Sequence, residues 1–231
     1  MRATRMAGVS GVGFVVLLGA SVLIEGARPD TFASDEAIHR FFAEAGNQDR
    51  AAVAAFLLIP AAALFLFFLA GLHDLLHRGD SPSGLSLAAM GGGVWFVAFI
   101  VLPKLVDNIT GASLAFSDTF RVDAQEARLA SGLAYWIQGA SMAGAAVLLV
   151  GASRLSRRAG LVGRRVEVVG YALAVTAPAA VALNGVPILL LLLGVLATGV
   201  FMASGRVVDP VRAHAREGRV ANGRGRIRSA P

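Results

Sequence analysis

The chain has 231 residues with a formal net charge of +6; 56% are hydrophobic, only 16% are charged, and its mean hydropathy is +0.67. A soluble domain carries charge on about a quarter of its residues, so this composition favours a membrane protein. The absence of cysteine excludes disulfides, thiolate nucleophiles and cysteine-ligated metal centres.

Six stretches approach the length of about 20 apolar residues that a helix needs to cross a bilayer. They lack the polar half expected of surface helices and are too long for buried strands. They cover residues 7–26, 51–72, 85–105, 131–152, 166–183 and 186–203. The sequence therefore predicts an all-α, polytopic bundle of six transmembrane helices in one domain, residues 1–205. Only "NG" separates the last two stretches, which predicts a tight helical hairpin.

The first stretch has an alternative interpretation as a signal peptide. "MRATR" precedes an apolar run, and Gly19 and Ser21 are small residues around a possible cleavage position. Cleavage would leave five helices and place the new N-terminus outside the membrane. The apolar run continues to Ile24, which favours an uncleaved first helix.

The next segment, residues 27–50, contains "SDEAIHRFFAEAG", which predicts a short amphipathic helix in an outer loop. Ser34 is a suitable N-cap and Gly46 a suitable terminator. Ile38, Phe41 and Phe42 recur on one helical face. We interpret this helix as a cover packed on the bundle; the alternative is a lid or a partner-docking element.

The second stretch ends in "HDLLH", which places His73 and His77 one helical turn apart with Asp74 beside the first. Two such histidines can share a metal, as in the HExxH signature. A catalytic zinc site generally needs three protein ligands, and no third is evident here. These histidines are therefore weak metal candidates, and the sequence favours a plain helix end without metal or other cofactor.

Glycines in the third and fourth stretches are typical of close helix packing. "GGG" at residues 91–93 and the spacing Ala140-x-x-x-Gly144 let backbones approach in a membrane. Trp95 lies mid-helix and is expected inside the bundle. Residues 106–130 are expected to form a second outer loop with Asn108 in an "NIT" glycosylation sequon, which has meaning only in a cell that glycosylates it. Within this loop, "SDTFRVDAQEARLASGLAYW" predicts that the fourth helix begins early, as an amphipathic turn or two outside the bilayer.

Basic residues predict the threading, because Lys and Arg accumulate on the cytoplasmic side. With the N-terminus inside, 15 of the 21 basic residues fall inside and ten of the 15 acidic residues fall outside. Both termini are then cytoplasmic, in a bacterial inner membrane. The tail, residues 206–231, is expected to be disordered and attracted to anionic lipid headgroups. No aromatic residues interleave with its arginines, so nucleic-acid binding is not predicted.

Five polar residues fall toward the predicted outer leaflet and form the candidate ligand-binding set. Such groups are costly near lipid, so they pair with one another or line a wet cavity. Lys104, the only lysine, is expected to pair with Glu25 or Asp107. The set is Glu25, Lys104, Asp107, Gln138 and Asn184. Pairing that merely holds helix ends in register is the simpler interpretation.

The overall plan resembles uncharacterised six-helix integral membrane proteins of high-GC bacteria. The resemblance is one of layout and composition over residues 7–203, including "LAGLHDLLHRGD" followed by "LSLAAMGGGVWF". No catalytic motif accompanies it, so it implies no activity.

The leading hypothesis is a structural, regulatory or partner-binding protein of the cytoplasmic membrane, alone or as a homo-oligomer. The alternative is a small-molecule or lipid transporter with an outward-facing polar mouth. These differ in whether the five polar groups surround a cavity. A metal-dependent membrane enzyme is a third, more distant possibility, since the sequence carries no identifiable catalytic residues.

Overall fold

The computed structural model describes residues 2–29, 32–76, 83–117, 119–177 and 186–204, and every regular element in these ranges is an α-helix. The elements are α1 (Arg2–Glu25), α2 (Asp35–Ala43), α3 (Ala45–Leu76), α4 (Ser83–Phe116), α5 (Ala124–Arg158), α6 (Arg164–Thr176) and α7 (Val186–Ala203). Within the described ranges, four helices are long and apolar enough to cross a membrane, namely α1, α3, α4 and α5.

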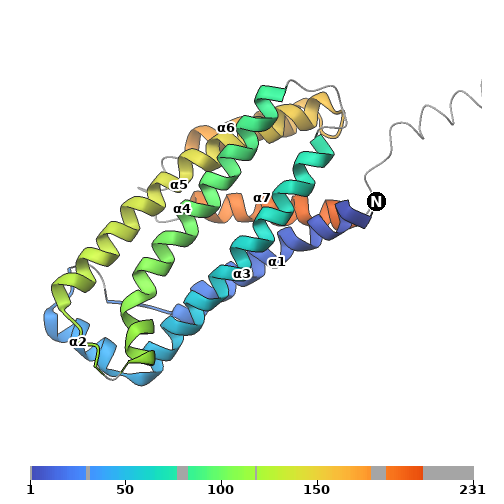
Figure 1. The fold of residues 1–231 in the computed structure, drawn as a ribbon. Helices are drawn as coiled ribbons and strands as arrows, with labels where there is room; N and C mark the ends of the chain where they lie inside the picture. Colours follow the sequence, from blue (N-terminus) through green and yellow to red (C-terminus); the bar gives the residue numbers. More distant parts are fainter. Residues whose placement is uncertain (1, 30–31, 77–82, 118, 178–185, 205–231) are drawn as a thin grey trace, which may run out of the picture.

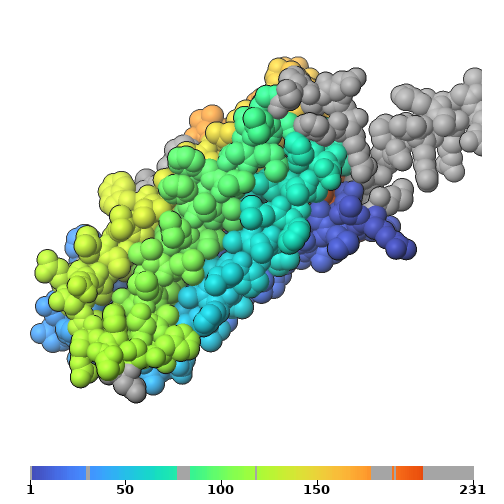
Figure 2. Space-filling view, in the orientation of Figure 1, coloured from blue at the N-terminus to red at the C-terminus, as the bar shows by residue number. Residues whose placement is uncertain are grey.

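The helices form an elongated bundle in which each of the four long helices packs against the next long helix in sequence. In the order α1, α3, α4 and α5, each long helix packs against the next, while α6 packs against α5 and α7 against α1 (Figure 1). The space-filling view shows α3 and α4 side by side along the molecule (Figure 2). We call the end that carries α2 the α2 end, and the end where α1 begins the opposite end.

Phenylalanine rings form the centre of the core. The ring of Phe65 in α3 lies 4.7 Å from that of Phe14 in α1 and 5.6 Å from that of Phe96 in α4, measured between centroids. All three side chains are fully buried. Tilted ring pairs at these separations are favourable beyond the apolar area that they bury, so this cluster ties three long helices together.

Large apolar side chains also cover the outside of the long helices. Leu23 of α1, Phe67 of α3 and Leu102 of α4 each expose half or more of their surface. Contiguous apolar surface is rare on soluble monomers. The arrangement is compatible with a membrane protein whose helices face lipid.

The long helices extend beyond the apolar stretches that indicated them. The first half of the predicted loop over residues 106–130 was wrong, because α4 continues to Phe116. The early start of α5, at Ala124, agrees with the prediction that this helix begins before its apolar stretch. Asp123 caps α5 by accepting hydrogen bonds from the backbone N–H groups of Gln125 (2.7 Å) and Glu126 (3.1 Å). Hydropathy falls at the first polar residues, whereas these residues still have good helical geometry and find partners on neighbouring helices.

Trp95 does not point into the bundle as expected. It is 48% exposed, stacks on Phe99 and donates its indole N–H to the carbonyl oxygen of Ala140 in α5 (3.0 Å). An indole needs one acceptor, and a carbonyl on the neighbouring helix supplies it at the bundle surface.

Candidate functional site

The candidate site begins where α1 ends. Gly26 has φ +69° and donates its N–H to the carbonyl oxygen of Val22 (3.3 Å), so the helix terminates in a left-handed turn. Glycine adopts this conformation without a Cβ penalty. The turn brings Arg28 back beside Glu25, with its Nε 3.0 Å from Glu25 Oε1.

Among the charged residues that the structure describes at this end, Glu25 is the most buried, with 7% of the residue exposed. Lys104 of α4 donates from Nζ to both of its carboxylate oxygens, at 3.2 Å and 3.1 Å. Glu25 therefore has two cationic neighbours, Lys104 and Arg28. Of the two partners expected for the only lysine, Glu25 and Asp107, the structure shows Glu25.

Arg28 also reaches α4. It donates from Nη1 to the carbonyl oxygen of Asp107 (2.6 Å), and Nη1 lies 3.3 Å from Asp107 Oδ1. Its Nη2 donates to Oδ1 of Asn108, which is fully buried and itself donates to the carbonyl oxygen of Lys104 (2.7 Å). An asparagine held in this way is not a surface acceptor, so the sequon over residues 108–110 does not mark an exposed loop.

The third helix in the site is α5, which contributes Ser131. Its Oγ donates to Asp107 Oδ1 at 2.7 Å. We call the set Glu25, Arg28, Lys104, Asp107, Asn108 and Ser131 the polar cluster. Two acids and two bases give it a net charge of zero. It joins α1, α4 and α5 at the α2 end.

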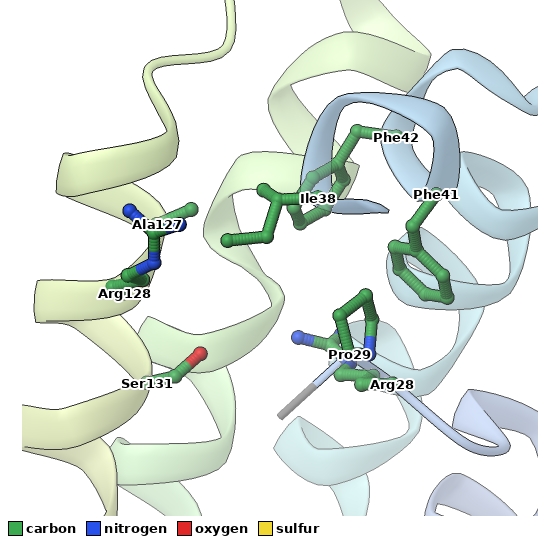
Figure 3. A pocket seen from close by; sticks show the side chains of 8 residues that line it. All are labelled: Arg28, Pro29, Ile38, Phe41, Phe42, Ala127, Arg128 and Ser131. Carbon is green, nitrogen blue, oxygen red and sulfur yellow. The ribbon is translucent and has the colours of Figure 1, made fainter. Parts of the chain in front are cut away.

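A small cavity adjoins the polar cluster under α2. Arg28 and Ser131 lie on one side of it and Ile38 and Phe42 on the other, as Figure 3 shows. Its volume is about 20 Å³, which is space for about one water molecule. Arg128 closes the rim by pairing with Asp35 and donating to the carbonyl oxygen of Ala33 (2.7 Å). The charged groups of the protein are thus paired with other side chains, and the cavity leaves little room for a solute.

The remaining members of the predicted set do not join the cluster. Gln138 is half-buried in α5, and in the part of the chain that the structure describes its side chain makes no hydrogen bond to the cluster. Asn184 lies outside the described residues. The sequence does not indicate Arg28, Asn108 or Ser131 as members of this cluster; the one local signal is Gly26, which favours a turn directly after Glu25.

The weak metal candidates are only partly described. His73 lies near the end of α3, where its Nδ1 is 2.9 Å from Ser86 Oγ of α4. His77 lies outside the described residues. No group of three or more His, Asp and Glu side chains arranged to hold a metal ion occurs in the ranges that the structure covers.

A second charged group, absent from the predicted set, lies at the opposite end between α5 and α6. Glu167 is buried, with 3% of the residue exposed, and pairs with Arg157. The hydroxyl of Tyr171 donates to Glu167 Oε1 at 2.9 Å, and Arg154 Nη1 lies 3.8 Å from the same oxygen. Because Glu167 lies in the first turn of α6, the positive end of the helix dipole also stabilises its carboxylate.

The chain matches no known family model, no curated protein and no solved structure. The resemblance in layout to six-helix bacterial membrane proteins therefore stays a prediction.

Proposed function

We propose that the chain is a six-span protein of the bacterial cytoplasmic membrane with both termini inside, and that its role is structural, regulatory or partner-binding. The four long apolar helices supply four of the spans. The proposal assigns the other two to α6 with the residues after it and to α7. The 18 residues of α7 correspond to about 27 Å of helix, close to the thickness of the hydrocarbon core.

Retention of the first helix is part of the proposal. Phe14 and Leu18 of α1 are buried in the core, and Gly8 lies against Gly199 of α7. Cleavage near Gly19 would remove these contacts and leave Glu25 near a new chain end. The packing therefore supports an uncleaved α1.

One observation carries the functional proposal: the polar cluster compensates its own charges. Small-molecule sites are clefts or cavities of about 300–1,000 Å³ in which a few placed polar groups orient the ligand. Here Glu25 and Asp107 are matched by Arg28 and Lys104, and the adjoining cavity has a volume of about 20 Å³. This geometry favours a clamp that holds α1, α4 and α5 in register over a transport mouth.

The clamp makes an asymmetric prediction about charge removal. Glu25→Gln leaves Arg28 and Lys104 facing one another with only Asp107 to balance them. Removing one partner of a buried pair costs about 3 kcal/mol. Lys104→Gln should cost less, since Arg28 remains beside Glu25. The double variant should be more stable than Glu25→Gln alone, because it restores equal numbers of acids and bases.

The measurement is thermal unfolding of the four proteins in one detergent, with size-exclusion chromatography to establish that each is folded. Arg121→Gln is the matched control, because Arg121 is an exposed cation at the same end. The clamp would be contradicted if the loss of stability in the double variant equalled the sum of the losses in the two single variants. Preserved stability together with loss of a solute-dependent thermal shift in Glu25→Gln would favour the transporter alternative.

A further inference from the structure

The turn between α5 and α6 concentrates positive charge at the opposite end of the bundle. Residues 153–171 contain five arginines and one acidic residue, Glu167, for a net charge of +4. All five arginines are exposed. They are Arg154, Arg157, Arg158, Arg164 and Arg165. We call them the arginine patch.

The backbone holds the patch in a fixed arrangement. Gly160 has φ +70°. The N–H of Leu161 donates to the carbonyl oxygen of Ser156 (2.9 Å), and the N–H of Gly160 donates to the carbonyl oxygen of Arg157 (3.0 Å). These two bonds form a Schellman motif that ends α5 sharply. A Cβ on Gly170 of α6 would lie 1.9 Å from the Oγ of Ser153, so the two helices also approach closely. The last turn of α5 and the first of α6 therefore lie side by side.

The single acid of this region does not neutralise the patch. Glu167 is already occupied by Arg157 and the Tyr171 hydroxyl, with Arg154 at 3.8 Å. Among the residues that the structure describes, Arg158, Arg164 and Arg165 have no acidic partner. The described part of the protein therefore supplies no anion for these three arginines, and an external anion could bind them.

Apolar side chains lie one helical turn from three of these arginines. Residues four apart share a helical face, so Val150 lies beside Arg154, Val168 beside Arg164 and Val169 beside Arg165. These valines are 38%, 55% and 56% exposed, respectively. On both helices, an arginine guanidinium group and an exposed valine side chain therefore lie within one helical turn of each other. A ligand that fits this surface has a negative head joined directly to an apolar chain.

We propose that the arginine patch binds the headgroup of an anionic phospholipid, with diphosphatidylglycerol as the best match. Its two phosphates face the guanidinium groups, and its acyl chains lie over the valines. Basic pockets between membrane helices are known to take such headgroups. An acidic soluble peptide fits less well, because it offers nothing to the exposed valines. This inference goes beyond the proposed function and requires that the bundle lies in a membrane with the arginine patch in a leaflet that contains anionic lipid.

The test compares two double variants with the same change in net charge. Arg158→Gln with Arg165→Gln removes two members of the patch, whereas Arg2→Gln with Arg5→Gln removes two exposed cations from α1 at the same end. Binding of diphosphatidylglycerol and phosphatidylcholine is measured by native mass spectrometry of protein in neutral detergent. We expect about 30-fold weaker binding of diphosphatidylglycerol in the patch variant and a much smaller change in the α1 variant.

Further arms identify the occupant. Arg158→Lys with Arg165→Lys should retain most binding, and an unchanged thermal transition without lipid should show that each variant is folded. Equal losses in the patch and α1 variants would overturn a discrete site in favour of general surface attraction. Phosphatidylcholine binding as tightly would also overturn the proposal. So would inorganic phosphate or a poly-glutamate peptide that binds the patch as tightly as the lipid does. The clamp experiment uses residues at the other end, so the two proposals fail independently.

Discussion

At the scale of single residues, glycines decide how closely α4 and α5 approach. A Cβ at Gly92 would lie 2.8 Å from both the carbonyl oxygen of Gly144 and the N of Leu148. A Cβ at Gly144 would lie 2.6 Å from the N of Phe96. These neighbours are backbone atoms, which cannot rotate away. By contrast, a Cβ at Gly91 would meet nothing within 4 Å.

The adjacent pair Gly91 and Gly92 gives a controlled prediction. Gly92→Ala should destabilise the bundle by about 1–3 kcal/mol, since the added methyl must push two helices apart. Gly91→Ala should be neutral or stabilising by up to about 1 kcal/mol, because alanine is the better helix former. Apparent melting temperatures in the same detergent measure both effects. Equal shifts in the two variants would contradict the close approach of α4 and α5.

The sequence predicted some residues of these contacts and missed others for identifiable reasons. Small-residue spacing indicated Gly92 and Gly144 because membrane helices have few other ways to approach closely. The only lysine, Lys104, pointed to two acidic partners, Glu25 and Asp107, without deciding between them. Arg28 was not traceable, since its position depends on the left-handed turn at Gly26. Nothing in local composition tells an arginine that turns inward from one that faces water.

At the scale of elements, α2 is attached to the bundle by a few separate contacts. Ile38 and Phe42 are buried against Ala124 and Ala127 of α5. Ser34 caps the helix by accepting from the N–H of Ala37 (3.3 Å). The helix stops at Ala43, before Gly46, because α3 already begins at Ala45. This packing agrees with the interpretation of α2 as a cover, while its position outside the membrane stays a prediction.

If α2 depends on this small apolar contact, it should open without unfolding the long helices. Phe42→Ala removes the larger buried side chain, a change that costs about 3–5 kcal/mol in a well-packed core. We expect faster hydrogen exchange of amides in residues 35–43 and unchanged exchange in α3 and α4. His39→Ala is the control, because His39 is exposed on the same helix. Faster exchange throughout the bundle in Phe42→Ala would show that α2 is part of the main cooperative unit instead.

At the scale of the whole molecule, hydropathy predicted the helical class, and the structure confirms several apolar helices. It did not predict which helices touch: α7 packs against α1 at the far end of the sequence. Small residues such as Gly8 and Gly199 make that contact possible, but small residues occur on most of these helices. Pairing over such distances depends on complementary shape along whole helices, which a single sequence does not display.

The number of spans and their direction are open to a direct test, because the chain contains no cysteine and each introduced one is a unique label site. Six spans with cytoplasmic termini require that Glu36→Cys and Asn184→Cys react with a membrane-impermeant maleimide in intact cells. Arg158→Cys should react only after permeabilisation. These expectations follow from the excess of arginine on one side, which resists translocation.

The position between α6 and α7 separates the alternatives most clearly. If α6 and α7 do not cross, Asn184→Cys should behave like Arg158→Cys, and the bundle has four spans. If Arg158→Cys reacts in intact cells while Glu36→Cys does not, the orientation is inverted, and the polar cluster lies on the cytoplasmic side. The clamp would survive that inversion, because charge compensation among Glu25, Arg28, Lys104 and Asp107 does not depend on which side faces the cell. The arginine patch would then lie in the outer leaflet, whereas the anionic lipid proposed to bind it is expected in the cytoplasmic leaflet.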